Sequence, residues 1–213
     1  LIVMACLDMF RFGWKYVPFV PERIIYPATP ITDYLMNKGK EEIFRIDREK
    51  AEIMPPSTWM QYRLMSPSGY DPMAIYDYAV TYQEKLNGNF DGRVSRYSEL
   101  DKYDSKALGN YNVKYLLVVK RGELGKLGGN DINYQINQKE WIKVFETFES
   151  AILENINYQP RARFLDSKDG EVKITSYTPN TIKISFSNGA GKTLLLADTW
   201  YPDSGMDAVI QDS

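Results

Sequence analysis

Histidine is absent from this chain of 213 residues, and cysteine occurs only once, at Cys6. The lack of histidine excludes a Ser-His-Asp triad, a Cys-His pair and histidine ligation of zinc or haem iron. A single cysteine excludes an internal disulfide and a thiolate metal cluster. The chemistry that remains is that of carboxylates, Lys, Tyr, Ser and Thr, or of a cation held by oxygen ligands.

An excess of basic charge is also lacking. The chain has 26 Lys and Arg against 28 Asp and Glu, so its net charge is -2 and nothing suggests a nucleic-acid partner. A hydrophobic share of 44% and a charged share of 25% fit a folded body with a sizeable core. The 16 Tyr and 9 Phe favour β-structure and interaction surfaces over a helical bundle.

Long hydrophobic runs are missing, but a short one opens the sequence. Residues 1–7 are all apolar, and Asp8 ends the run. A bilayer takes about 20 apolar residues to cross. The run also lacks the basic region and cleavage site of a signal peptide. It is either the last two turns of a transmembrane helix or a buried N-terminal strand or helix, and both interpretations stay open.

Aromatic and basic residues follow this run directly. Arg11, Trp14, Lys15 and Tyr16 are of the types that prefer the membrane interface, so we expect them to anchor the chain there. The alternative is an aromatic core with a salt bridge. Four prolines between residues 18 and 30 favour extended, turn-rich chain.

Residues 1–122 predict a mixed α/β part. A helix is expected to start at Thr29-Pro30, because Thr is a good N-cap and Pro suits the first helical position. Helical spacing of apolar residues indicates another helix over 73–85, ended by Asn87-Gly88-Asn89. Strands are expected at 42–47 and 113–119, and irregular chain over 91–109.

Residues 123–213 predict mostly β-structure. Short segments rich in β-formers alternate with turn residues, at 141–148, 151–154, 172–175, 181–186 and 193–198. This pattern is typical of a small antiparallel β-sandwich. The sequence therefore predicts an α+β protein, with a mixed α/β part over 1–122 and a β-sandwich part over 123–213.

One segment resembles a phosphate-binding loop, Asn188-Gly-Ala-Gly-Lys-Thr193. The full motif needs glycine where this chain has Phe186, and a helix where a strand is expected after Thr193. We therefore expect a hairpin turn here and no nucleotide site.

Two acidic or polar segments could suggest a cation site. Residues 131–137 alternate oxygen-bearing side chains, but a calcium loop would need glycine at Ile136 and glutamate at Ile142. We expect an exposed strand edge there. The carboxylates between residues 91 and 104 have no fixed spacing and indicate a solvated loop.

Seven stretches of the chain, taken together and in order, resemble the C-terminal extracytoplasmic part of the YfhO family of bacterial polytopic membrane proteins. They span nearly the whole chain and comprise residues 8–13, 26–35, 68–72, 108–116, 153–162, 177–180 and 194–202. Within them stand Ser-Gly-Tyr-Asp-Pro at 68–72, Leu-Gly-Asn-Tyr-Asn at 108–112, and Leu-Leu-Leu-Ala-Asp-Thr-Trp-Tyr-Pro at 194–202. The family tends to continue as Tyr-Pro-Gly-Trp where this chain has Tyr201-Pro-Asp-Ser-Gly-Met206, so the aromatic residue is lost.

The resemblance implies many membrane helices before residue 1 and a last one after residue 213. It implies a domain at the extracytoplasmic face of the cell membrane, in a protein similar to lipid-linked-sugar glycosyltransferases that decorate teichoic acids or related envelope glycans. The catalytic carboxylate of that class is expected in an early loop outside this chain. We therefore expect no catalytic residue, cofactor or metal site here.

Five residues are candidates for contact with a glycan or a phosphate. They are Arg11, Trp14, Tyr70, Asp71 and Arg161, and we expect them to line one membrane-facing surface. Arginine offers a forked donor for phosphate or carboxylate, while Tyr and Trp offer flat faces for sugar stacking. A buried ion pair between Asp71 and an arginine is the alternative.

The sequence thus leaves two hypotheses for function. The first is a substrate-binding or capping domain of a membrane glycosyltransferase, with its own flanking helices and a lipid-linked sugar or polyanionic glycan as partners. The second is a non-enzymatic extracellular interaction or carbohydrate-binding module.

Overall fold

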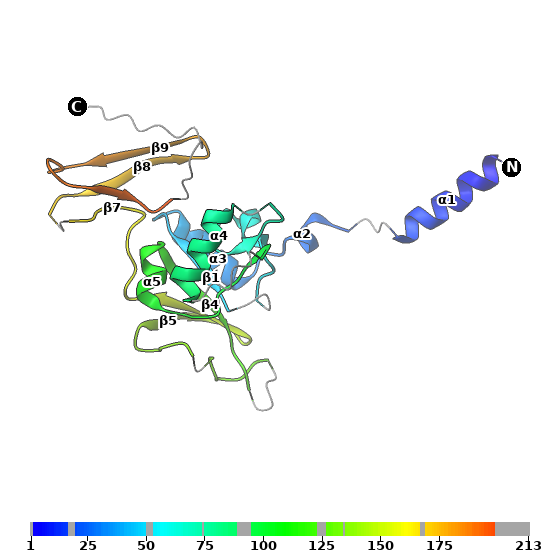
Figure 1. The fold of residues 1–213 in the computed structure, drawn as a ribbon. Coiled ribbons are helices and arrows are strands. Elements are labelled where there is room, and N and C mark those ends of the chain that lie inside the picture. Colours follow the sequence, from blue (N-terminus) through cyan, green and yellow to red (C-terminus); the bar gives the residue numbers. More distant parts are fainter. Residues whose placement is uncertain are drawn as a thin grey trace.

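The structure of the chain is a computed structural model, and it describes residues 2–16, 20–49, 53–73, 75–88, 95–122, 127–133, 135–166 and 169–198. The protein is α+β, as the sequence predicts (Figure 1). Its helices are α1 (Ile2–Tyr16), α2 (Glu22–Ile25), α3 (Pro30–Gly39), the 3-10 helix η1 (Thr58–Tyr62), α4 (Tyr76–Tyr82), the π-helical turn η2 (Gln83–Asn87) and α5 (Ser105–Asn110). Its strands are β1 (Arg45–Arg48), β2 (Gly69–Tyr70), β3 (Tyr97–Ser98), β4 (Val113–Val119), β5 (Trp141–Glu146), β6 (Ser150–Asn155), β7 (Ala162–Phe164), β8 (Val172–Thr178), β9 (Thr181–Phe186) and β10 (Leu194–Leu196).

A four-stranded sheet in the order β1-β4-β6-β5 forms the centre of the body. β1 runs parallel to β4, whereas β4, β6 and β5 are antiparallel to their neighbours. The side chains of β4 alternate between two cores, because successive residues of a strand point to opposite faces. Leu116 and Val118 pack with α4 and α5, and Tyr115 and Leu117 pack with α3 and η1. Helices therefore cover both faces of the sheet.

The C-terminal strands form two pairs, β7 with β10 and β8 with β9, and β7 lies beside β8. β5 and β6, which were expected to belong to the β-sandwich, are part of the central sheet. The β-sandwich therefore stays a prediction. The central sheet takes β1 and β4 from before residue 122 and β5 and β6 from after it. The expected boundary between residues 122 and 123 thus runs through one sheet.

Several local expectations are confirmed. α3 begins at Pro30 with Thr29 as its N-cap, and the Thr29 hydroxyl accepts a hydrogen bond from the backbone N–H of Thr32 at 3.2 Å. The expected helix over 73–85 is α4, which continues into η2 and ends at Gly88 with a φ of +73°. A positive φ suits glycine because it has no Cβ.

Other expectations are wrong. Residues 105–110, expected to be irregular, form α5, whose N-cap Asp104 accepts hydrogen bonds from two backbone N–H groups. The described residues of 131–137 make an isolated bridge at Asp131 and turns instead of a strand edge. Residues 188–193 do form a turn before a strand, but β10 pairs with β7 and not with β9, so the turn closes no hairpin.

The apolar N-terminus forms α1, which continues past Asp8 to Tyr16. The described residues of α1 are exposed or half-buried, so α1 is not a strand or helix of the core. Within the described part of the chain, no helix has the length and hydropathy needed to cross a membrane. Leu1, Tyr134 and the expected motif at 199–206 lie outside the described residues.

Candidate functional site

Four buried charged residues, three on β1 and one directly after it, form an unusual polar site of the body. Arg45, Asp47 and Arg48 lie on this strand and Glu49 follows it, and all four are buried. Burying charge is costly unless each group finds a partner, so this segment must be matched by polar groups from elsewhere. Two centres supply them.

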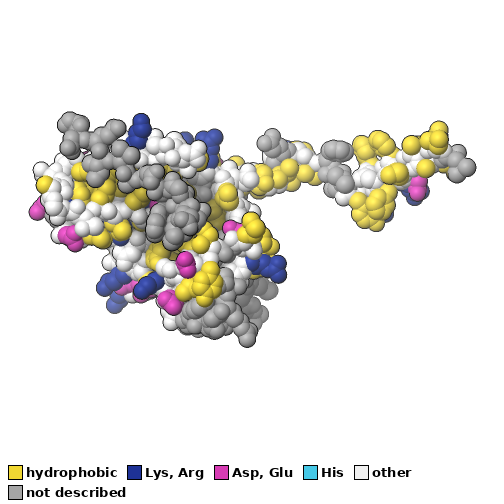
Figure 2. Space-filling model, turned by 45° about the horizontal axis from the view of Figure 1, so that its top comes forward, with side chains coloured by type: hydrophobic (Ala, Val, Ile, Leu, Met, Phe, Trp, Pro, Cys, Tyr) yellow, Lys and Arg dark blue, Asp and Glu magenta, His cyan; other side chains and the backbone are white. Residues whose placement is uncertain are grey.

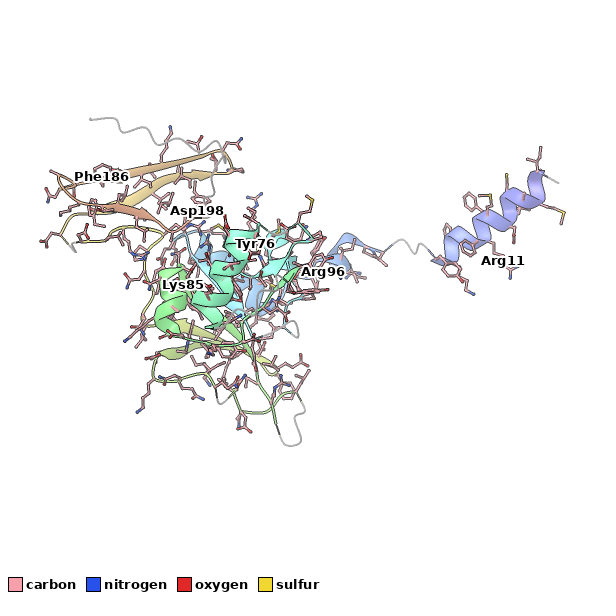
Figure 3. All side chains as sticks on the ribbon, in the orientation of Figure 1. Arg11, Tyr76, Lys85, Arg96, Phe186 and Asp198 are labelled. Carbon is pink, nitrogen blue, oxygen red and sulfur yellow. The ribbon has the colours of Figure 1, made fainter. Side chains whose placement is uncertain are left out.

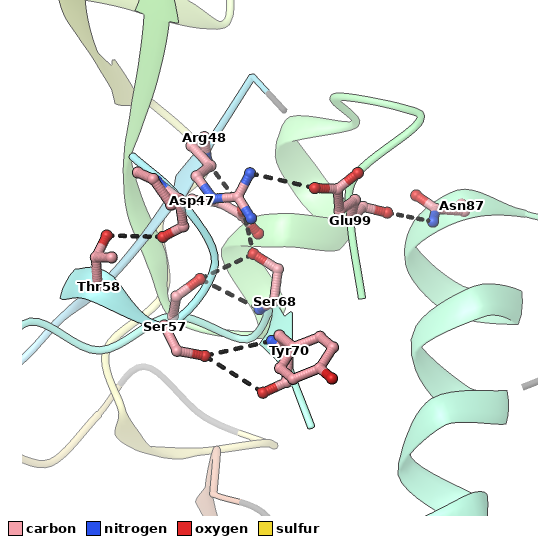
Figure 4. A network of polar contacts seen from close by, with 10 residues as sticks. Asp47, Arg48, Ser57, Thr58, Ser68, Tyr70, Asn87 and Glu99 are labelled. Atoms are coloured by element: carbon pink, nitrogen blue, oxygen red, sulfur yellow. Dashed lines mark hydrogen bonds and ion pairs between the residues drawn. The ribbon is translucent and has the colours of Figure 1, made fainter. Parts of the chain in front are cut away.

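The first centre surrounds the Asp47 carboxylate. Its Oδ1 accepts hydrogen bonds from the Ser68 hydroxyl at 2.6 Å and from the Arg48 backbone N–H at 2.8 Å (Figure 4). Its Oδ2 is buried and has no hydrogen-bond partner among the described residues. Burial raises the pKa of Asp47 to about 6, against the opposing effect of the two hydrogen bonds. The Asp47 carboxyl group therefore titrates at a higher pH than an aspartate in water.

The guanidinium of Arg48 lies beside this carboxylate. It sits over the Trp59 ring at 5.2 Å from the centroid, and its Nη1 lies 3.6 Å from Oε1 of Glu99. Nε and both Nη atoms lack hydrogen-bond partners among the described residues. Asn87 fixes the Glu99 segment, because its amide donates to the Glu99 carbonyl at 2.9 Å (Figure 4). The charge of Arg48 is thus balanced by the aromatic face of Trp59 and the carboxylate of Glu99.

Glu49 has a structural role at the end of β1. Its Oε2 accepts from the Val119 backbone N–H at 3.2 Å, and its Oε1 accepts from the Asn133 amide at 2.9 Å. Both oxygens therefore tie the last residue of β4 and the loop around residue 133 to β1.

The second centre is a two-arginine cluster, formed by Arg45, Arg161, Tyr177 and Asp198. Arg161 Nη2 donates to Asp198 Oδ2 at 3.0 Å, and the Tyr177 hydroxyl donates to the same oxygen at 2.7 Å. Arg45 Nη2 lies 3.6 Å from Asp198 Oδ1. Burial lowers the pKa of Arg45, and the charge of Arg161 lowers it further. Burial and the hydrogen bond to Asp198 raise the pKa of Tyr177.

This cluster joins segments that are far apart in the sequence. Arg45 comes from β1, Arg161 precedes β7, Tyr177 belongs to β8, and Asp198 follows β10. Figure 3 shows Asp198 where the C-terminal strands meet the rest of the body. Three of these residues, Arg161, Tyr177 and Asp198, come from three different stretches of the resemblance described above. The geometry of the two-arginine cluster suits the attachment of the C-terminal strands to the central sheet.

Comparisons with protein-family models, with curated proteins and with solved structures found no match for this chain.

The five residues predicted from the sequence lie in three places. Arg11 and Trp14 are exposed on α1, and Figure 3 shows Arg11 away from the body. Tyr70 ends β2 and Asp71 follows it, both exposed. Arg161 is only 3% exposed and pairs with Asp198, so it shares no exposed surface with Tyr70. Contact of any of them with a glycan or phosphate stays a prediction.

The alternative prediction, a buried ion pair between Asp71 and an arginine, is wrong. Asp71 is exposed, and its Oδ1 accepts from the Met73 backbone N–H at 2.8 Å. A partly buried ion pair with an arginine joins Arg161 and Asp198 instead.

Sequence reasoning missed Arg45, Asp47, Arg48, Tyr177 and Asp198. Alternation over 42–47 correctly indicated a strand, but it also implied that the charged side chains face water. The signal in the sequence that could have indicated buried charge was its density. Four of the five residues in Arg45-Ile-Asp-Arg-Glu49 are charged, two of each sign. Such a balanced set can be buried as pairs.

Two shallow depressions on the body are lined mostly by residues with polar side chains. One is lined by Lys102, Tyr103, Asp104, Lys106, Gln135, Asn137 and Glu140. The other is lined by Arg121, Asn130, Asp131, Ile132, Asn133 and Gln138. The part of the chain that the structure describes holds no group of three or more His, Cys, Asp or Glu that is arranged for a metal ion.

Proposed function

We propose that this chain is the extracytoplasmic domain of a multispanning membrane protein of the lipid-linked-sugar glycosyltransferase type. In this proposal α1 lies in lipid, and the body acts as an accessory part that binds or caps substrate and does not catalyse transfer. The observation that carries the proposal is the exposure of α1. The seven stretches of resemblance to the YfhO family support the class of parent protein.

α1 presents a large exposed apolar surface. Nine of its large hydrophobic side chains are between 64% and 81% exposed: Ile2, Val3, Met4, Leu7, Met9, Phe10, Phe12, Trp14 and Tyr16. Leaving such a side chain in water forgoes roughly 1.5–3 kcal/mol relative to burying it. An uncovered surface of this kind favours a lipid environment.

The charged residues of α1 are arranged for the surface of a bilayer. Asp8, Arg11 and Lys15 are spaced three and four residues apart, so they share one face of the helix. Trp14 and Tyr16 add the aromatic types that prefer the interface. A helix with one charged face and an apolar remainder is typical of segments that lie at the membrane interface.

Vesicle flotation tests this proposal. We expect the 213-residue chain to float with vesicles of phosphatidylcholine and phosphatidylglycerol, and the double variant Leu7→Asp/Phe10→Asp to remain in solution, because charge in the apolar face of α1 opposes insertion. The matched control is Phe148→Asp/Ile156→Asp, which changes exposed apolar residues of the body and should float normally.

Two results would contradict the proposal. If the wild-type chain does not float, or if both double variants float equally well, α1 does not hold the chain in lipid. If the purified chain transfers sugar from a polyprenyl-phosphate-linked donor, the accessory role is wrong and the body is itself an enzyme.

A further inference from the structure

We propose that one end of the body, which we call the aromatic tip, rests on the headgroup region of an anionic bilayer. The tip consists of the exposed residues Met60, Arg63, Tyr70, Asp71, Met73, Arg96 and Tyr97. The proposal rests on the proposed function, since it places the bilayer that holds α1 against a second surface of the same chain.

Strand pairing and hydrogen bonds make the tip one continuous surface. The Ser57 hydroxyl lies 3.3 Å from the Tyr70 backbone nitrogen and 3.4 Å from its carbonyl oxygen, which fixes the start of η1 to β2 (Figure 4). Tyr70 is paired with Tyr97 across the β2–β3 ribbon, and their rings lie 4.9 Å apart. The side chains of η1 and of both strands are therefore presented together.

The loop after β2 belongs to the same surface. The Asp71 backbone N–H donates to the Arg96 carbonyl at 3.0 Å, which extends the ribbon by one residue. The Asp71 carboxylate accepts from the Met73 backbone N–H at 2.8 Å and so holds that residue next to the ribbon. Met73 is 86% exposed, the largest value among the described hydrophobic residues.

The tip lies at the end of the body from which the chain leads to α1. The Tyr62 hydroxyl of η1 donates to the carbonyl of Pro27, which lies two residues after α2, at 3.0 Å. Figure 3 shows Arg96 on the side of the body nearest α2, and Figure 1 shows α2 between the body and α1. Ile24 and Ile25 of α2 are themselves 58% and 53% exposed. In Figure 2 hydrophobic side chains lie at this end of the body, next to Lys or Arg side chains.

The composition of the tip favours a lipid headgroup layer as its occupant. Tyrosine has an apolar ring and a polar hydroxyl, which suits the boundary between acyl chains and water. Methionine adapts to an irregular apolar surface. Arg63 and Arg96 outnumber the one carboxylate of the tip, Asp71, and guanidinium groups match phosphate geometry. The tip lies at the end of the body that leads to α1, which we propose to lie in lipid. This position favours a bilayer over another protein as the partner of the tip.

Site-specific fluorescence tests the proposal on the full chain. Cys6 is exposed on α1 and is the single cysteine, so a nitrobenzoxadiazole label on the native chain reports α1. In a Cys6→Ser background, the label is placed by Met60→Cys or Tyr97→Cys in the tip, or by Phe186→Cys as the control. Phe186 is 44% exposed on β9, at the opposite end of the body (Figure 3).

With vesicles of phosphatidylcholine and phosphatidylglycerol, we expect brighter, blue-shifted emission at positions 60 and 97 and no change at 186. A response at Cys6 without one at 60 and 97 would overturn the tip proposal and leave the proposed function standing. No response at Cys6 would overturn the proposed function itself. An equal response at 186, or a response without vesicles that grows with protein concentration, would indicate adsorption or self-association and overturn the tip proposal.

Charge variants give a second, independent measurement. Arg63→Gln/Arg96→Gln should weaken binding to the anionic vesicles roughly tenfold or more, because each basic residue near an anionic surface contributes to binding. Lys173→Gln/Lys183→Gln removes two exposed charges from the β8–β9 pair and should leave binding unchanged. Equal weakening by both double variants would contradict a role of the tip.

Discussion

At the scale of single residues, the decisive feature of this protein is charge inside the body. β1 buries charged side chains at three of its four positions and places a fourth, Glu49, just beyond its end. Glu49 and Arg45 obtain direct partners, whereas Asp47 keeps one oxygen without a hydrogen bond among the described residues. A carboxylate in such a place holds a proton more readily than one in water. The stability of this fold is therefore expected to vary with pH through Asp47.

Asp47→Asn should remove a pH-dependent part of the stability. The pKa of Asp47 is raised from 3.8 to about 6, so the folded state binds the proton more tightly than the unfolded state. This stabilising contribution is fully present below the unfolded pKa and is lost as pH rises through about 6. Relative to the variant, the wild type should gain about 2 kcal/mol in unfolding free energy between about pH 7.5 and about pH 4.5.

Urea unfolding of both chains across this range measures the difference. Ser68→Ala removes a hydrogen bond that lowers the pKa of Asp47, so the window in which stability changes should move to higher pH. A difference between wild type and Asp47→Asn that does not vary with pH would show that Asp47 does not titrate in this range.

At the scale of elements, the helices differ in how they are held. α3 carries its own start signal in Thr29-Pro30, and its residues Ile31 and Leu35 pack into the core. α5 is only six residues long, and it is fixed by the Asp104 cap and by close packing against the segment after β6. A Cβ on Gly109 would lie 2.2 Å from the Asn157 carbonyl oxygen. Glycine at this position is therefore required by packing, at some cost in helix propensity.

Gly109→Ala should destabilise the body by roughly 1–3 kcal/mol, because overpacking against backbone outweighs the gain of about 1 kcal/mol in helix propensity. The matched control is Gly13→Ala in α1, where a Cβ meets nothing within 4 Å. This control should raise the helical signal in circular dichroism without lowering the thermal midpoint. If Gly109→Ala melts at or above the wild-type temperature, α5 does not pack as closely as described.

At the scale of the whole molecule, the body is held together across the sequence. The central sheet joins strands from both sides of residue 122, so the two expected parts share one core. The C-terminal strands are connected to that core through the two-arginine cluster, in which Asp198 pairs with Arg45 and with Arg161. Arg161 is the closer of the two arginines to the Asp198 carboxylate, at 3.0 Å against 3.6 Å for Arg45.

Arg161→Gln should lower the unfolding free energy by roughly 1.5–3 kcal/mol, the usual contribution of a hydrogen bond to a charged group, because Asp198 keeps Arg45 beside it. Asp71→Asn should change it by less than about 0.5 kcal/mol, because Asp71 is exposed and asparagine keeps an acceptor for the Met73 N–H. Urea midpoints of the two variants provide the comparison. Similar midpoints for both would mean that the cluster does not attach the C-terminal strands, and Arg161 would return as a candidate for ligand contact.

Local sequence signals were sufficient for the class of fold and for most elements. The α+β class, the capped start of α3, the end of η2 near Gly88, and the strands β4, β6, β8 and β9 all follow from caps, turn residues and periodicity. These signals act over a few residues, so they can be recognised without knowledge of the rest of the chain. The exposed, lipid-favouring character of α1 was one of two open interpretations of residues 1–7.

Only the tertiary structure decided which strands pair and which charges are buried. β10 pairs with β7 and not with β9, its neighbour in the sequence, and β5 and β6 belong to the central sheet. Strand pairing of this kind depends on contacts between distant segments. Contacts between distant segments also place the five candidate residues in different parts of the molecule. Arg161 is drawn inside by Asp198, which is 37 residues away, while Tyr70 and Asp71 stay at the exposed tip. The charges of β1 are tolerated inside because partners such as Ser68, Glu99 and Asp198 reach them from remote elements, and no local pattern in the sequence carries that information.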